Sequence, residues 1–221
     1  MAGKVLVNET AVTKAGTPVD SGARIRIKGE TCPYVSRGGL KLAGALDDLG
    51  VDVSGRIILD VGASTGGFTD VCLKRGAIKS YAVDVGTNQL DYSLRMDERV
   101  FSLERTNARE LSLEMLPGPA DLAVVDVSFI SITKVLPNVA ACLTSNGAVL
   151  AMVKPQFEAG KSNVGKGGVV RDSTIRKGCV DGVRDAAAVL GLVEKGRADA
   201  RIRGPKGNQE TFLYLIKGET P

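Results

Sequence analysis

The sequence predicts an α/β fold, with a Rossmann-like, mostly parallel sheet behind a small β-rich segment. Apolar strand-like runs alternate with helix-like segments, which is typical of a parallel sheet. The strands are expected at 56–60, 80–84, 100–104, 121–126 and 147–153, and the helices at 67–75, 88–95, 131–144 and 172–190. Two late strands are expected at about 192–201 and 211–217. The last strand follows a loop rather than a helix, so we expect it to insert antiparallel.

Composition limits the classes of function. The 221 residues, 43% of them apolar, suffice for one full domain and a small appendage. Four cysteines lie far apart without C-x-x-C spacing, and the start does not resemble a signal peptide, which together predict reduced thiols and a cytoplasmic protein. No apolar run approaches the ~18–20 residues of a membrane span, so no membrane partner is expected. Histidine is absent, which excludes Ser-His-Asp and Cys-His catalysis and histidine-ligated metals, and no metal site is expected.

The first 29 residues differ from the rest of the chain. Their pattern, V-L-V-N-x-x-x-V-x-K-x-G-x-x-V-x-x-G-x-x-I from Val5 to Ile25, resembles a small RNA-binding domain shared by a ribosomal protein, pseudouridine synthases and tyrosyl-tRNA synthetases. The two helices that normally open that domain are missing, so we expect Met1 to be an internal position of a longer natural chain or a late start. The expected organisation is a truncated RNA-binding remnant at 1–29, a linker at 30–35 and the α/β domain at 36–221. That domain would open with a helix capped by Ser36 and ended by Gly50.

A glycine-rich turn at 59–68, answered by a second strand that ends in Asp84, predicts an adenosine-bearing cofactor. Glycines let backbone approach a ligand, and an acid at that strand end can accept hydrogen bonds from ribose hydroxyls. Ser64 stands where a dinucleotide site wants its second glycine, and Asp60 would repel a pyrophosphate but suit an ammonium or sulfonium group. S-adenosylmethionine is therefore favoured over a nicotinamide or flavin cofactor, or a turn without a ligand. The residues expected to bind it are Asp60, Gly62, Ala63, Ser64, Gly66, Gly67, Phe68, Asp84, Val85, Asn107, Ala108 and Asp126.

Four charged residues are candidates for chemistry. Two of them, Asp126 and Lys154, end apolar strands at the edge where ligands bind in open α/β sheets. Lys41 lies on the expected leading helix, and Glu210 precedes the final strand. A lysine at a strand end can also be purely structural, and Lys41 and Glu210 could be ordinary surface charges. The segment after Asp126 lacks the Asp/Asn-Pro-Pro-aromatic sequence of methylases that act on base amines, which disfavours that class.

Positive charge gathers in the last third of the chain. From 160 to 206, eleven basic residues face five acidic ones, a distribution suited to a phosphate backbone, although a solvated basic surface is the alternative. The loop at 160–168 matches part of a phosphate-binding loop, but Gly167 stands where a Ser or Thr should coordinate magnesium. We therefore reject an NTPase and expect a mobile basic loop that grips RNA.

Four phrases together make a specific resemblance: S-R-G-G-L-K, D-V-G-A-S-T-G-G-F-T, V-K-P-Q-F-E and G-N-x-E. The chain resembles the hemolysin A-type (TlyA-like) RNA 2′-O-ribose methyltransferases, which belong with the FtsJ-like methylases. The K-D-K-E tetrad of those enzymes matches, in order, Lys41, Asp126, Lys154 and Glu210. The resemblance implies a seven-stranded S-adenosylmethionine-dependent methyltransferase sheet and a cytidine in ribosomal RNA or ribosomal subunits as substrate. It also implies that Lys154 orients or deprotonates the 2′-hydroxyl, of which we favour orientation.

Two other functions stay open. One is a catalytically idle module that binds S-adenosylmethionine or RNA, or an assembly factor, and the truncated front end is the reason to keep this hypothesis. A pore-former, which the name hemolysin suggests, is a remote alternative because no membrane-spanning segment is visible. Nothing in the sequence predicts an oligomeric state.

Overall fold

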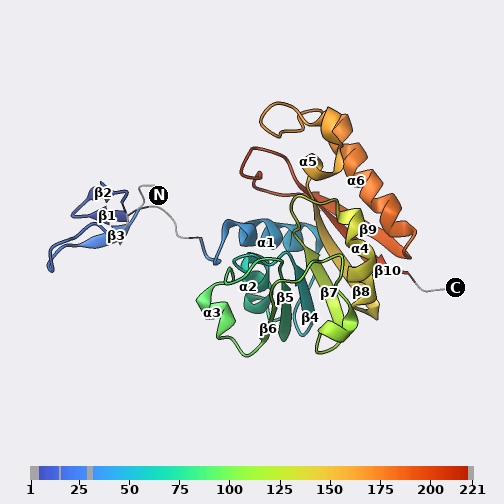
Figure 1. Ribbon diagram of the computed structural model, residues 1–221, viewed down its shortest axis with the longest axis horizontal. Helices are drawn as coiled ribbons and strands as arrows, with labels where there is room; N and C mark the ends of the chain where they lie inside the picture. Colours follow the sequence, from blue (N-terminus) through green and yellow to red (C-terminus); the bar gives the residue numbers. More distant parts are fainter. Residues whose placement is uncertain (1–4, 15, 29–31, 219–221) are drawn as a thin grey trace. The chain divides into compact units, whose positions relative to one another are not determined.

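The computed structural model describes residues 5–14, 16–28 and 32–218 (Figure 1). The chain divides into two compact units, Met1–Pro33 and Tyr34–Pro221. The first unit holds a three-stranded antiparallel sheet in the order β2 (Thr10–Val12), β1 (Val5–Val7) and β3 (Ile25–Ile27). Strand pairing rather than a large apolar core defines this unit, since Leu6 is the buried hydrophobic residue of its described part.

The second unit is built on a seven-stranded sheet in the order β6-β5-β4-β7-β8-β10-β9. Its strands are β4 (Ile57–Val61), β5 (Lys79–Val83), β6 (Val100–Leu103), β7 (Ala120–Val125), β8 (Leu143–Val153), β9 (Leu192–Asp199) and β10 (Thr211–Lys217). The first five pair in parallel, and β10 lies antiparallel between β8 and β9. This confirms the predicted α/β class and the antiparallel insertion of the last strand.

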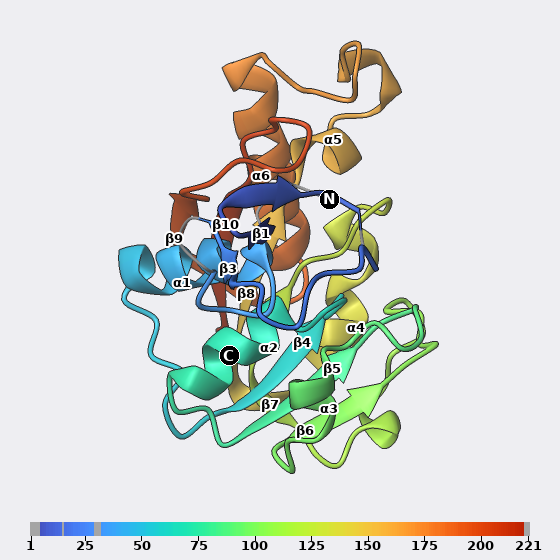
Figure 2. The same ribbon diagram turned by 90° about the vertical axis from the view of Figure 1, so that its left-hand side faces the viewer.

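Helices cover both faces of this sheet, as Figures 1 and 2 show from two sides. One apolar core joins the sheet to α1 (Arg37–Leu49), α2 (Gly67–Lys74) and α3 (Tyr92–Arg95). The core on the other face joins it to α4 (Leu136–Ala141) and α6 (Ser173–Ala188). Neighbouring residues of one strand serve the two cores in turn, since Leu122 faces the first and Ala123 the second. Burial on both faces explains why these strands read as continuous apolar runs.

Two helix predictions were wrong in extent. The segment at 131–144 is not one helix but a 3-10 turn at Ile132–Lys134, then α4, and then the start of β8 at Leu143. Pro137 explains the break, because proline lacks the N–H that would continue a preceding helix and favours the first turn of a new one. The predicted helix at 88–95 is reduced to the four residues of α3, which begin after the N-cap Asp91. Among the described residues, no helix is long and apolar enough to cross a membrane.

The caps of α1 were predicted in part. Gly50 ends the helix in the left-handed conformation, with φ of 61°, as expected. Ser36 takes the N-cap position, but its side chain makes no capping hydrogen bond. The entry to this helix is held differently, because the backbone N–H of Val35 donates to the carboxylate of Asp70 in α2.

The turn between β4 and α2 brings two strands into close approach. Gly62 has a φ of 88°, and a Cβ on it would lie 2.5 Å from the carbonyl oxygen of Asp126, just beyond β7. Gly66 has a φ of 91°, and a Cβ there would lie 2.3 Å from the Leu94 side chain. Only glycine suits both positions, because each combines positive φ with a contact too short for a side chain.

Asp60 holds the same turn in place from inside the protein through hydrogen bonds. Its side chain is fully buried, and one carboxylate oxygen accepts hydrogen bonds from the backbone N–H and the hydroxyl of Thr69 in α2. The other oxygen is buried without a hydrogen-bond partner. Burial raises the pKa of this carboxyl from 3.8 to about 7, although the hydrogen bonds from Thr69 oppose the shift.

Replacing Gly62 by alanine tests the close approach. We expect Gly62→Ala to lower the free energy of unfolding by about 1–3 kcal/mol, because it forces positive φ on a residue with a Cβ and crowds the Asp126 carbonyl. Denaturant unfolding measures this. The control is Gly182→Ala on the exposed side of α6, where a Cβ would meet nothing within 4 Å. That change should be neutral or stabilise by up to about 1 kcal/mol, and an equal loss in both variants would contradict the account.

The raised pKa of Asp60 predicts a pH dependence of stability. Between about pH 4 and about pH 7 the folded state keeps a proton that the unfolded state has released, so the free energy of unfolding should fall as pH rises, by at most about 1.4 kcal/mol per pH unit. Above the folded pKa this contribution is flat. Asp60→Asn stays neutral and lacks the effect, so the wild type should lose stability relative to this variant as pH rises from 4 to 7. Asp52→Asn, at an exposed site, should track the wild type, and a constant wild-type-to-D60N difference would refute the prediction.

Candidate active site

Two adjoining cavities lie at the carboxyl ends of the parallel strands, where open α/β sheets place their ligands. One measures about 1200 Å³ and reaches toward β5 and β6. The other measures about 680 Å³ and reaches toward α1 and the segment before β10. The residues that line both are Gly62, Ser64, Asp126, Ser128, Phe129, Gln156, Phe157 and Val164. A ligand in the larger cavity would therefore meet one in the smaller cavity at the turn after β4.

Asp84 presents its carboxylate to the larger cavity. Its two carboxylate oxygens accept hydrogen bonds from the backbone N–H groups of Ser64, at 2.8 Å, and Gly86, at 2.7 Å. These bonds fix the carboxylate beside the glycine-rich turn. A carboxylate has about four acceptor positions, so both oxygens keep capacity for further donors such as the two hydroxyls of a ribose. The cavity thus fits an adenosine-bearing cofactor.

The other residues expected at the cofactor separate into two groups. Those that line one or both cavities are Gly62, Ala63, Ser64, Gly67, Phe68, Asp84, Val85, Asn107, Ala108 and Asp126. Asp60 and Gly66 do not line either of them. The Asp60 side chain is turned inward to Thr69, and a Cβ on Gly66 would meet Leu94. Both residues shape the turn from behind the cavities, and their contact with the cofactor stays a prediction.

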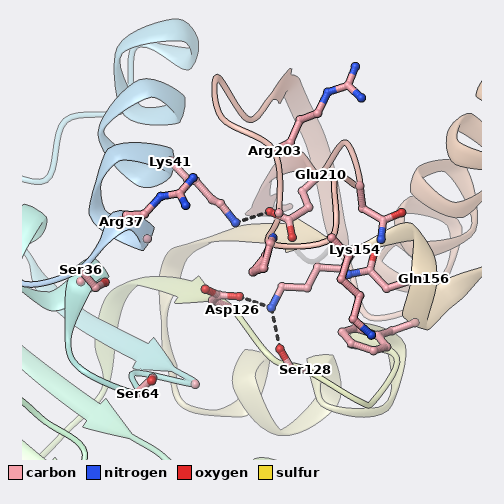
Figure 3. Close-up of a pocket in the computed structure, with 18 of the residues that line it drawn as sticks. Ser36, Arg37, Lys41, Ser64, Asp126, Ser128, Lys154, Gln156, Arg203 and Glu210 are labelled. Carbon is pink, nitrogen blue, oxygen red and sulfur yellow. Dashed lines mark hydrogen bonds and ion pairs between the residues drawn. The ribbon is translucent and has the colours of Figure 1, made fainter. Parts of the chain in front are cut away.

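In the smaller cavity, two side chains hold the ammonium group of Lys154. Lys154 lies directly after β8, and its Nζ pairs with the Asp126 carboxylate and donates to the Ser128 hydroxyl at 2.8 Å (Figure 3). Asp126 follows the neighbouring strand β7, so the parallel pairing of β7 and β8 brings both side chains to one edge. Lys154 is 9% exposed and Asp126 keeps a quarter of its side chain accessible. The ammonium is therefore fixed in place yet open to a small group in the cavity.

A second ion pair faces the first. The Lys41 Nζ of α1 lies 2.5 Å from a carboxylate oxygen of Glu210, as Figure 3 shows. Glu210 immediately precedes β10, whose antiparallel pairing with β8 places Thr211 opposite Val153 and so brings Glu210 near Lys154. Lys41 is 8% exposed and Glu210 is 1% exposed. A Cβ on Gly204 would lie 2.6 Å from Glu210, so the absence of a side chain there makes room for the carboxylate.

Burying the charges of Lys41, Lys154 and Glu210 is costly, and their pairing compensates part of the cost. An ion removed from water without a counter-charge is strongly unfavourable, whereas a paired and hydrogen-bonded one is tolerated. Two buried lysines in one cavity are a poor choice for stability alone. Their arrangement is better explained by a use for positive charge and N–H donors at that position.

Sequence reasoning missed several residues of this site. Ser128 was overlooked as a partner of Lys154, although its place two residues after Asp126 offered a signal. Arg37 and Gln156 also line the smaller cavity, and Figure 3 shows both directed toward it from α1 and from the segment after β8. Phe129 is 91% exposed, has a φ of 64°, and contacts Phe157 with the two rings tilted and their centres 5.3 Å apart. No periodicity in the sequence signals such an exposed aromatic residue in a left-handed conformation.

The chain is similar to known proteins over most of its length. The FtsJ-like methyltransferase family matches residues 34–217. The 16S/23S rRNA (cytidine-2'-O)-methyltransferase TlyA of Mycobacterium tuberculosis is 46% identical over 97% of this chain and 80% of its own length. Hemolysin A of Brachyspira hyodysenteriae is 42% identical over 98% of this chain and 90% of its own length.

A solved structure is also similar to this chain over its whole length. The "putative hemolysin" of Streptococcus thermophilus has a TM-score of 0.86 and 45% sequence identity, covering all of this chain and 81% of its own. The family model spans almost all of the unit that carries both cavities, including Lys41, Asp126, Lys154 and Glu210. The chain belongs to the FtsJ-like methyltransferase family.

Proposed function

We propose that this protein transfers a methyl group from S-adenosylmethionine to the ribose 2′-hydroxyl of a cytidine in ribosomal RNA. The observation that carries the proposal is the meeting of the two cavities at Gly62, Ser64 and Asp126. The larger offers the Asp84 carboxylate to an adenosine, and the smaller offers the Lys154 ammonium to an oxygen nucleophile.

The relatives support the substrate. Those named TlyA carry the cytidine-2'-O specificity in their names, and this chain matches most of their length. Ribosomal RNA or ribosomal subunits are accordingly the partners we propose, in the cytoplasm where ribosomes are found. We also propose that the three-stranded unit at the front contributes to RNA binding, as its resemblance implies.

Placement accounts for most of the proposed chemistry. When bound, S-adenosylmethionine supplies a methyl group on a positively charged sulfur, which is already activated for transfer. Asp126 favours positive charge at the junction of the cavities. Lys154, held by Asp126 and Ser128, is an N–H donor that can fix the 2′-oxygen in line with the methyl group.

Proton release completes the reaction. An ammonium has no lone pair to accept a proton, so in this arrangement Lys154 orients the hydroxyl. The proton leaves to water as the oxygen–carbon bond forms and the methyl–sulfur bond breaks, and the leaving group is a neutral thioether. Lys41 and Glu210 form the second ion pair of the smaller cavity, in which the Glu210 carboxylate holds the Lys41 ammonium in place. The residues expected to be catalytic remain Lys41, Asp126, Lys154 and Glu210.

Lys154→Met separates catalysis from binding. We expect methyl transfer to ribosomal subunits to fall by about 100-fold or more, because the donor that positions the oxygen is lost, while calorimetric affinity for S-adenosylmethionine is kept. Asp84→Ala should show the opposite order of effects. Its cofactor affinity should fall by about 10-fold or more. Transfer of labelled methyl groups and calorimetry measure the two.

The controls distinguish an enzyme from an idle binding module. Unfolding curves check that both variants fold. Equal transfer by Lys154→Met and the wild type would overturn the assigned role. A wild type that binds S-adenosylmethionine and ribosomal subunits but transfers nothing would support an assembly factor instead.

The buried pair Lys41–Glu210 predicts strong coupling. Lys41→Met and Glu210→Gln should each lower the free energy of unfolding by about 3 kcal/mol, because each leaves the other partner buried without its counterpart. The double variant should lose clearly less than the sum of the two. Denaturant unfolding of the four proteins gives the coupling energy, and strict additivity would contradict the pair.

A further inference from the structure

A separate cleft with four cations lies beside the active site. It has a volume of about 680 Å³ and lies between the segment at 169–176 and the segment at 199–209. Its basic lining residues are Arg171, Arg176, Arg203 and Lys206. In Figures 1 and 2 the loops that carry these residues, orange before α6 and red before β10, lie at the same end of the domain.

These four cations lack the carboxylate partners that neighbouring arginines have. Arg184 pairs with Asp181 and Asp185, and Arg197 pairs with Asp181 and Glu194. By contrast, none of the four lining cations forms an ion pair with an acidic residue in the described part of the chain. The cleft thus keeps its positive charge uncompensated within the protein.

Nearby groups do little to neutralise this charge. Asp199 is the acidic residue of the lining, and its carboxylate already accepts a hydrogen bond from Thr211 at 2.7 Å. Arg176 donates to the backbone carbonyl of Arg171 at 2.6 Å, which fixes its guanidinium but leaves its charge. A cleft with four positive charges and one carboxylate attracts an anion.

Asn208 gives the cleft a defined shape. It is 2% exposed, accepts from the backbone N–H of Val170 at 2.9 Å and donates to the carbonyl of Gly168 at 2.8 Å. The backbone carbonyl of Asn208 accepts a hydrogen bond from the backbone N–H of Gly204. One buried side chain therefore ties together the two loops that bear the cations, two residues before Glu210 of the active site.

The cleft also adjoins the active site. Arg203 and Lys206 line both the cleft and the cavity that contains Lys154. In Figure 3 the Arg203 side chain points away from Glu210, out of the active site. An extended anionic chain with one unit at Lys154 could thus place a neighbouring unit in the cleft.

We propose that this cleft binds a backbone phosphate of the RNA strand next to the nucleotide that is methylated. The proposal rests on the proposed function for the nucleotide in the active site. Guanidinium groups suit phosphate oxygens because they donate two parallel hydrogen bonds. Such contacts fix the register of the strand without reading its sequence.

Salt dependence of RNA binding tests the cleft directly. Fluorescence anisotropy with a labelled single-stranded RNA oligonucleotide gives the slope of log K against log salt for the full chain. The double variant Arg171→Gln/Arg203→Gln should reduce the magnitude of that slope by about 0.7, the change for the one phosphate that the protein no longer neutralises. Affinity for S-adenosylmethionine should be unchanged.

Two matched variants isolate position from charge. Arg184→Gln/Arg197→Gln removes the same charge from the ion-paired arginines outside the cleft and should keep the wild-type slope. Arg171→Lys/Arg203→Lys keeps the charge in the cleft, so it should retain most of the slope even if the geometry of the contacts is worse. The same change of slope in both glutamine variants would overturn the proposal, as would an unchanged slope in Arg171→Gln/Arg203→Gln.

Failure of the cleft and failure of the proposed function give different results. A wild type that methylates ribosomal subunits, with an unchanged slope in Arg171→Gln/Arg203→Gln, would refute the cleft alone. A wild type that transfers no methyl group, but whose RNA binding loses slope only in the cleft variant, would refute the activity and support an RNA-binding cleft. A wild type that binds no RNA would refute both. Inorganic phosphate that binds the cleft without any effect of the variants on RNA would show a free-anion site and also refute it.

Discussion

The close approach of Gly62 to the carbonyl of Asp126 is the constraint on which the site depends. It lets the turn after β4 pack directly against the end of β7, and a side chain on Gly62 would force the two segments apart. The two cavities meet at that position. The two cavities become neighbours because a Cβ is absent. The proposed reaction needs such neighbours, because methyl transfer is governed by in-line placement.

The sheet order then determines which charges meet. Asp126 and Lys154 follow adjacent parallel strands, so their proximity is a consequence of strand pairing. Glu210 reaches the same edge only because β10 runs antiparallel to β8 and is entered from that end. A parallel last strand would begin at the opposite edge and leave Lys41 without its partner. The departure from parallel pairing is thus a requirement of the charge arrangement.

The sequence predicts most of this fold because its signals are local. Apolar runs end in acids, the glycine turn has fixed spacing, and the residues of the tetrad stand in recognisable phrases. What it could not predict depends on direction in space. Nothing in the spacing tells that Asp60 faces inward to Thr69 while Asp84 faces the cavity, since both end apolar strands. The helix predicted at 131–144 was wrong for a local reason, because the helical periodicity of the segment did not reveal the interruption at Pro137.

Charge pairing separates the basic residues of the C-terminal third into two physical classes, although composition counts them alike. Arg184, Arg197 and Arg201 are held by carboxylates on their own surface, which limits their attraction for an external anion. The cations of the cleft donate to backbone or face open space, so their field extends outward. A net charge of +4 therefore understates the local potential beside the active site. That potential lies where the proposed RNA strand would pass beside the methylated nucleotide, which makes pairing state a better guide to an RNA path than the density of basic residues.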